Sequence, residues 1–121
     1  MKVDQFVVNI NSEQPETLIA FYRDVVGLTP NEEMGPGAFM AGSSSFIALI
    51  IEGHSDVKGA TKEPHRVLLN FHVSDLAAEE LRLKDQGVEF IMSATEEPGF
   101  GTIATFLDPD GNYCQLMELG S

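Results

Sequence analysis

The side chains able to bind or transform a small molecule lie mostly in strand-like segments of this chain. His72 is the histidine in such a segment, and an imidazole can contact a ligand or act as a general base because it exchanges protons near neutral pH. The alternative for His72 is a structural histidine that is hydrogen-bonded at the rim of a sheet. The other polar candidates are amides and a phenol, which form hydrogen bonds without ionising near neutral pH. They are Gln5, Asn9, Asn70, Tyr113 and Gln115.

The sequence gives little support for other kinds of reactive site, such as a nucleophilic triad or a phosphate-binding loop. His54 and His65 lie in a polar, turn-rich stretch and are interpreted as surface histidines. Cys114 is the one cysteine, which excludes an internal disulfide, and its place next to Gln115 in an alternating strand predicts a core position. No spacing of Cys, His and Asp suggests a nucleophilic triad. The glycine-rich segment 35–42 lacks the lysine and the following helix of a phosphate-binding loop.

Length and charge restrict the partners. A chain of 121 residues predicts one domain with a modest core. Nineteen acidic against seven basic residues give a net charge of −12, so we expect no nucleic-acid partner, because phosphate binding requires basic patches. An acidic surface attracts cationic small molecules, although it can also serve solubility alone. The longest apolar run, 46–51, is too short to cross a bilayer, and no signal peptide is recognised, so we expect a cytoplasmic protein without a membrane partner.

The first half of the chain reads as a strand, a helix and further strands. Alternation predicts a strand over 3–11 that carries Gln5, Val7 and Asn9 on one face and apolar residues on the other. A helical stripe of apolar residues predicts a helix over 15–26. The remaining segments are a short strand around a glycine-rich turn in 31–42, a strand over 43–53 and a linker over 53–66.

The second half repeats this order. A strand predicted over 66–75 carries Leu68, Asn70 and His72 on one face. It is followed by a helix over 76–87, a strand over 88–94, and a hairpin of 101–108 with 112–119 around Pro109-Asp110-Gly111. Each half therefore reads as a βαβββ module, which indicates internal duplication. We predict a single α+β domain over 1–121, with module 1 at about 1–58 and module 2 at about 64–121.

Paired modules of this kind can curl their sheets into a cupped, barrel-like cavity with the helices outside. The second face of each strand then lines the cavity, and two loops, one with Phe39 and Met40 and one with Phe100, cover its mouth. The alternative is that these side chains only fill a barrel core, but several amides on one face favour a wet or ligand-occupied cavity. The predicted ligand-binding residues are Gln5, Val7, Asn9, Phe39, Ala48, Leu68, Asn70, His72, Phe100, Tyr113, Gln115 and Met117.

Two stretches and the paired-module order carry a family resemblance. The stretches are "LIAFYRDVVGL" at 18–28 and "PGFGTIATFLDPDGNYCQLMEL" at 98–119. The chain resembles the vicinal oxygen chelate superfamily, which includes glyoxalase I, bleomycin-resistance proteins and extradiol dioxygenases. The resemblance implies paired βαβββ modules and a homodimer. Whether the modules pair within one chain or across two chains stays open.

The resemblance also bears on metal binding. Metal enzymes of this superfamily take one ligand, typically His, Gln or Glu, from each of four strands. The matching positions here are Gln5, Ala48, Leu68 and Gln115. Alanine and leucine have no donor atoms, and two neutral amides are poor ligands for divalent transition metals. We therefore predict no metal and no cofactor.

Two functions from different classes follow from these expectations. The first is a metal-free small-molecule-binding protein of the glyoxalase/bleomycin-resistance type, which sequesters a drug or a metabolite. The second is a glyoxalase-like lyase or isomerase acting in the same cavity, with His72 as the candidate base. The chain has three arginines, none clearly placed to hold the carboxylates of glutathione, which argues against glyoxalase I itself.

Overall fold

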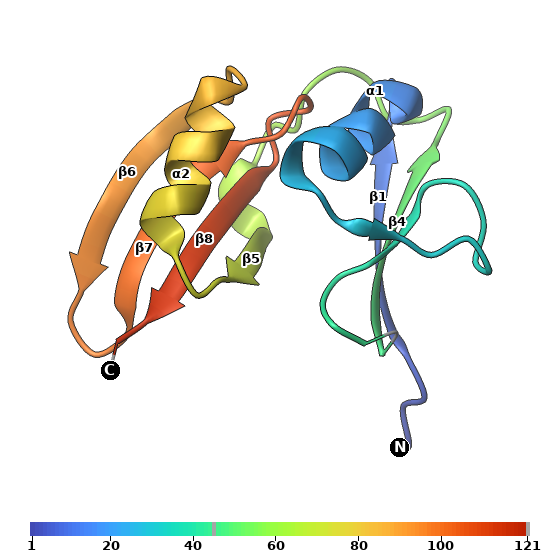
Figure 1. The fold of residues 1–121 in the computed structure, drawn as a ribbon. Helices are drawn as coiled ribbons and strands as arrows, with labels where there is room; N and C mark the ends of the chain where they lie inside the picture. The colour runs from blue at the N-terminus through green and yellow to red at the C-terminus, as the bar shows by residue number, and fades with distance from the viewer. Residues whose placement is uncertain (45, 121) are drawn as a thin grey trace. The chain divides into compact units, whose positions relative to one another are not determined.

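Each half of the chain forms its own sheet, and a helix of the same half covers one face of that sheet (Figure 1). The computed structural model describes residues 1–44 and 46–120. The chain divides into two compact units, Met1–Gly59 and Ala60–Ser121, so the boundary lies inside the predicted linker. Ser45, in the strand predicted over 43–53, and Ser121, at the end of the predicted second module, lie outside the described residues.

In its described part, the first unit has one strand before its helical segment in the sequence and three strands after it. In chain order the elements are β1 (Phe6–Ser12), α1 (Pro15–Ala20), η1 (Phe21–Val26), β2 (Thr29–Pro30), β3 (Ala38–Met40) and β4 (Ile47–Gly53). The strands are ordered β1-β4-β3-β2, with β1 parallel to β4 and the other neighbours antiparallel. The two-residue strand β2 was not predicted, because so short a strand has no detectable alternation.

The second unit repeats this topology. Its elements are η2 (Pro64–Arg66), β5 (Leu68–His72), α2 (Leu76–Asp85), β6 (Phe90–Glu97), β7 (Gly101–Leu107) and β8 (Tyr113–Leu119). The strands are ordered β5-β8-β7-β6, and β5 runs parallel to β8. The matching order in both units confirms the predicted α+β fold built from βαβββ units. Across the described residues, no helix has the length and apolar character to cross a membrane.

The helical segment of the first unit changes its winding halfway. The α-helix α1 continues directly into η1, a π-helix, whose wider turns were not predicted. Gly27 ends the segment with φ +90°, and the Tyr22 carbonyl accepts hydrogen bonds from the N–H groups of Gly27 and Leu28. Leu18 and Tyr22 are fully buried, so the predicted apolar stripe is confirmed. Apolar spacing identifies the buried face of a helix, but it does not separate α from π winding.

The core of the first unit lies between this helical segment and the sheet. Leu49 and Ile51 of β4 are almost completely buried there, together with Phe39 of β3, which pairs with Leu49. The expectation that Phe39 lies in a loop over the mouth of a cavity is wrong, because its side chain belongs to this core and is 1% exposed. An apolar residue between glycines reads equally well as a loop or a short strand.

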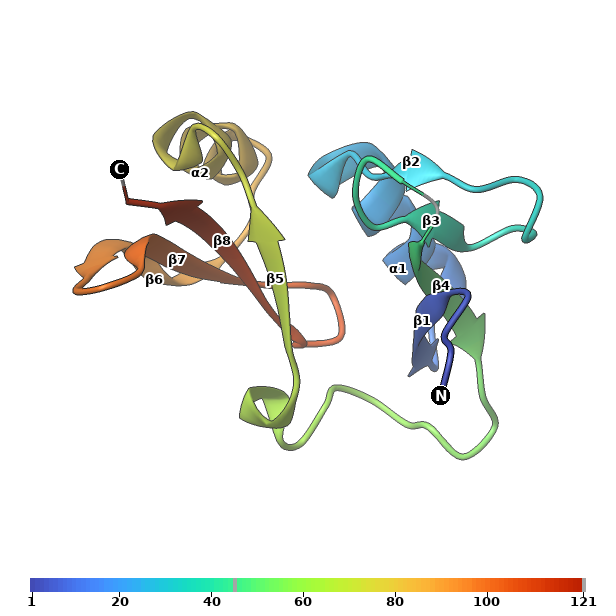
Figure 2. The same ribbon diagram turned by 90° about the horizontal axis from the view of Figure 1, so that it is seen from below.

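The core of the second unit lies between α2 and the sheet. Leu76 and Leu83 of α2 are buried, as are Phe106 of β7 and Cys114 of β8, which pair with each other. The predicted core position of Cys114 is confirmed. Figure 2, which views the fold from below, shows that α2 lies on one side of the sheet formed by β5 to β8. Among the described residues of the second unit, no α-helix covers the other side.

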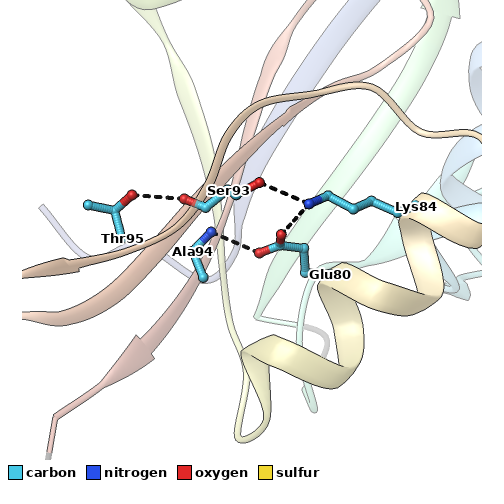
Figure 3. A network of polar contacts seen from close by, with 5 residues as sticks. All are labelled: Glu80, Lys84, Ser93, Ala94 and Thr95. Atoms are coloured by element: carbon cyan, nitrogen blue, oxygen red, sulfur yellow. Dashed lines mark hydrogen bonds and ion pairs between the residues drawn. The ribbon is translucent and has the colours of Figure 1, made fainter.

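A polar network fastens α2 to the edge strand β6 (Figure 3). Glu80 Oε1 accepts a hydrogen bond from the backbone N–H of Ala94 at 2.9 Å, and Glu80 Oε2 lies 2.5 Å from Lys84 Nζ. Lys84 Nζ also lies 2.9 Å from Ser93 Oγ. Ser93 and Ala94 lie where the pairing of β6 with β7 shifts register, so the carboxylate satisfies an N–H at an irregularity of the ladder.

Candidate functional site

The sheet of the second unit has one face turned away from α2, and strand pairing aligns its side chains in rows. Partners across strands share a face, while successive residues along a strand alternate between faces. The rows on this face are Leu68–Tyr113–Leu107, Asn70–Gln115–Thr105 and His72–Met117–Ile103. We name these nine residues the open face. Their neighbours along each strand, such as Cys114 and Phe106, are buried on the side of α2.

The open face brings together the residues that the sequence predicted on β5 and β8. On β5, Leu68 is 40% exposed, and Asn70 and His72 are also exposed. On β8 the predicted residues are half-buried, namely Tyr113, Gln115 and Met117. The face combines apolar side chains with amides, a phenol and an imidazole. This combination is typical of small-molecule sites, where apolar contact provides area and a few polar groups orient the ligand.

The middle row of the open face is polar. Gln115 Nε2 donates a hydrogen bond to Thr105 Oγ1 at 3.1 Å. Thr105 is 4% exposed, whereas Gln115 is half-buried and Asn70, on the edge strand, is exposed. The sequence reasoning did not select Thr105, because only strand pairing shows that β7 places its hydroxyl beside Gln115.

The first row of the open face includes a ring contact that was also missed. The rings of His65 and Tyr113 lie edge to face, with centroids 4.6 Å apart and an interplanar angle of 61°. His65 is exposed, as its interpretation as a surface histidine predicts, but it lies against a side chain of the open face. The signal that could have found it is the pairing of Leu68 with Tyr113, which brings the segment before β5 next to the start of β8.

His72 lies at the end of β5, opposite Met117. Among the described residues, no carboxylate forms a hydrogen bond or ion pair with His72. A histidine that acts as a base is usually held in place by a partner on its other ring nitrogen.

The predicted ligand-binding residues of the first unit do not lie together on one accessible surface, because some are exposed and others are buried. Val7 is 38% exposed and pairs with Ala48, which is completely buried, and Asn9 is exposed on the same face of β1. Gln5 precedes β1, and its Nε2 donates to Met34 Sδ at 3.6 Å. Phe39 lies on the opposite, helix-covered face, as described above. The structure therefore leaves Val7 and Asn9 as the accessible predicted residues of this sheet face.

Phe100 lies in the turn between β6 and β7 and is 63% exposed. Its backbone carbonyl accepts a hydrogen bond from Gly120 N–H at 3.1 Å, which fixes the turn next to the end of β8. The prediction placed Phe100 in a loop, and the structure places it in a loop with an exposed ring.

The first unit also holds a pocket of about 410 Å³ that the sequence did not predict. Its lining combines residues of the helical segment with the stretch from Pro30 to Phe39. Arg23 belongs to the lining, but its guanidinium is bound by Asp24 at 2.9 and 3.0 Å. Most of the lining is apolar, its charged residues are Arg23 and Glu32, and Arg23 is already paired with Asp24.

The positions that the resemblance assigns to metal ligands do not suit a divalent transition metal. Ala48 and Leu68 offer hydrocarbon side chains, and Gln5 and Gln115 offer neutral amides, of which Gln115 is bonded to Thr105. Within residues 1–44 and 46–120, no group of three or more His, Cys, Asp or Glu side chains is arranged to hold a metal ion.

Comparisons with known proteins agree on one family. The sequence model of one protein family, the Glyoxalase/Bleomycin resistance protein/Dioxygenase superfamily, matches residues 2–116 of this chain. Among solved structures, TnmS3, an antibiotic binding protein from Streptomyces sp. CB03234, is 25% identical with a TM-score of 0.68, over 99% of this chain and 97% of that chain. A glyoxalase/dioxygenase from Nostoc punctiforme is 14% identical with a TM-score of 0.76, over 99% and 92% of the chains. No curated protein matches the chain.

A further solved structure is a glyoxalase/bleomycin resistance protein/dioxygenase family enzyme from Burkholderia phytofirmans PsJN. It is 21% identical to this chain, with a TM-score of 0.70, over 94% of this chain and 97% of that chain. At identities of 14% and 21%, the similarity to the Nostoc and Burkholderia proteins concerns the fold alone.

Proposed function

Because the chain belongs to the Glyoxalase/Bleomycin resistance protein/Dioxygenase superfamily, we propose that it binds a small molecule on the open face of its second unit, without a metal ion, and so sequesters a drug or a metabolite. The observation that carries this proposal is the alignment of Leu68, Asn70 and His72 with Tyr113, Gln115 and Met117 on the sheet face opposite α2. The name of TnmS3 as an antibiotic binding protein supports the same kind of ligand.

The composition of the open face supports a ligand that is largely apolar and has a few polar groups. Apolar side chains of the outer rows flank the polar middle row, and the rings of Tyr113 and His65 offer edges and faces to an aromatic system. The net charge of −12 favours neutral and cationic molecules over anions. Planar aromatic antibiotics, neutral or cationic, combine these properties and are the ligands to test first.

A titration calorimetry panel of such antibiotics tests the proposal with two matched leucine variants. Leu68→Ala removes an exposed leucine from the open face, and Leu81→Ala removes an exposed leucine from α2. For a ligand that binds the wild-type chain, Leu68→Ala is expected to weaken affinity by about fivefold or more, as loss of a contacting apolar side chain does. Leu81→Ala is expected to leave affinity unchanged. Equal affinities in both variants would contradict binding at the open face.

We extend the proposal to a homodimer, which the family resemblance implies, and to a cytoplasmic location, which we expect from the sequence. Exposed apolar side chains near the start of β1, including Phe6 and Ile47, support an association of this kind, because such side chains are usually covered. Sedimentation equilibrium at micromolar concentration should give twice the mass of one 13.2 kDa chain. A single-chain mass across the accessible concentration range would refute the dimer without affecting the proposal of ligand binding.

A further inference from the structure

We infer that Thr105 is a positioning residue, which holds the side-chain amide of Gln115 so that the open face selects ligands with a hydrogen-bond donor. The inference rests on the proposed function, because it concerns the chemistry of the ligand that the open face would take. It adds a residue outside the set predicted from the sequence, and it gives the polar middle row a specific task.

The geometry fixes one end of the amide. Thr105 and Gln115 are direct partners across the antiparallel pair β7 and β8, and the Nε2 to Oγ1 distance is 3.1 Å. Thr105 is 4% exposed, so surrounding side chains hold it in place, and a β-branched residue has little rotational freedom at χ1. Gln115 is half-buried and therefore has a surface that a ligand can reach. A buried, stiff partner thus orients an accessible amide.

The other end of the amide is left for a ligand. Among the described residues, no protein donor reaches Gln115 Oε1, which keeps both lone pairs available. A ligand N–H or O–H at this point would satisfy the oxygen. A ligand that presents only an acceptor to Gln115 Oε1 would place two acceptors together and leave this oxygen desolvated without a partner, which is unfavourable.

The side chains in the two rows beside the amide indicate which chemical groups the rest of the ligand should have. Leu68 and Leu107 lie on one side of the middle row, and Met117 and Ile103 lie on the other. A ligand that covers the face therefore meets apolar side chains on both sides of one polar line. The chemical class that fits is an aromatic or otherwise apolar molecule with a hydroxyl or N–H group, such as a phenol.

Phenol and its methyl ether, anisole, are the probes that test this inference. They differ in the donor and have similar apolar surface. Their affinities would be measured by following 15N–1H signals of the full chain, including the side-chain amide of Gln115. The variants are Thr105→Val, which removes the hydroxyl and keeps the shape, and Thr105→Ser, which keeps the hydroxyl. Gln115→Leu removes the amide itself and serves as a second route if Thr105→Val does not fold.

The wild-type chain and Thr105→Ser are expected to prefer phenol over anisole by about three- to tenfold, the size of one net hydrogen bond. The preference should fall towards one in Thr105→Val and in Gln115→Leu, while binding of anisole changes little. An unchanged preference in a folded Thr105→Val variant, or in Gln115→Leu, would overturn the inference and leave the proposed function standing. If neither probe shifts any signal of the open face, the inference is contradicted, whereas the proposed function is decided by the antibiotic panel.

Discussion

At the scale of single residues, Gly37 shows how closely the first unit is packed before β3. Its φ is +82°, and a Cβ atom built there would lie 2.6 Å from the backbone oxygen of Ile51. Ile51 N–H also donates to the Gly37 carbonyl at 2.8 Å, so the two backbones cannot easily separate. A side chain at this position would meet both a disfavoured backbone conformation and a backbone atom that cannot move away.

Gly37→Ala is therefore expected to lower the free energy of unfolding by about 1–3 kcal/mol, the usual cost of such strain. Gly42→Ala is the matched control, because Gly42 has no positive φ and a Cβ atom added there would meet nothing within 4 Å, so it should change stability little. Urea denaturation of both variants measures the difference. A variant Gly37→Ala as stable as Gly42→Ala would show that the turn has room to adjust.

A substitution of His72 can distinguish ligand binding from catalysis. Since no carboxylate orients its imidazole among the described residues, His72→Asn is expected to alter ligand affinity and to have no turnover to abolish. The measurement pairs calorimetry with an assay on the hemithioacetal of methylglyoxal and glutathione. Turnover by the wild-type chain that disappears in His72→Asn, with affinity intact, would establish the lyase or isomerase instead.

The alternation of side chains along each strand was enough to predict which side chains of β5 and β8 share a face. Leu68, Asn70 and His72 alternate with apolar partners, and the structure places them together with Gln115. Thr105 was missed because it joins this group only through the pairing of β7 with β8, which depends on where strands meet rather than on the pattern within one strand.

At the scale of elements, Glu80 connects α2 with β6 and responds to pH. Burial of the Glu80 carboxylate acts to raise its pKa, but the hydrogen bonds from Lys84 and from Ala94 N–H, with the charge of Lys84, outweigh burial and hold the pKa below its usual value. A carboxyl with a lowered pKa contributes stability above the unfolded-state value of about 4.3. This contribution is lost as the pH falls through the folded-state pKa.

Glu80→Gln is expected to lower the free energy of unfolding by about 1–3 kcal/mol at neutral pH, since it leaves Lys84 without its carboxylate partner. The difference from the wild-type chain should shrink in acid, below the folded-state pKa. Glu79→Gln is the control on the same helix, because its exposed pair with Arg82 should contribute less than about 1 kcal/mol. Denaturation curves at several pH values test this, and a difference that stays constant into acid would contradict the role of the charge.

The order of the elements was predictable from the periodicity of apolar residues, whereas the irregularities within the elements were not. The first helix was predicted over 15–26, and in the structure Gly27, with φ +90°, ends this helical segment. The π winding of η1 and the register shifts of β6 leave the apolar pattern almost unchanged, because they depend on packing against the neighbouring element.

At the scale of the whole molecule, the charge of −12 should act on ligands at a distance. The affinity for a cationic antibiotic is expected to fall several-fold when salt rises from about 0.05 M to about 0.5 M, because screening shortens the reach of the acidic surface. A neutral antibiotic of similar shape should bind with nearly the same affinity at both concentrations. Equal salt dependence for both ligands would show that the surface charge serves solubility rather than recognition.

The proposal that a small molecule occupies the open face is tested most directly by locating a bound ligand against methyl groups on the two sides of one sheet. Met117 and Ile103 lie on the open face, whereas Leu116 and Ala104 alternate with them and face α2. We predict nuclear Overhauser effects from an antibiotic selected in the binding panel to the methyl groups of Met117 and Ile103, and none to Leu116 or Ala104. Tight binding without contacts to Met117 or Ile103 would contradict the proposed site.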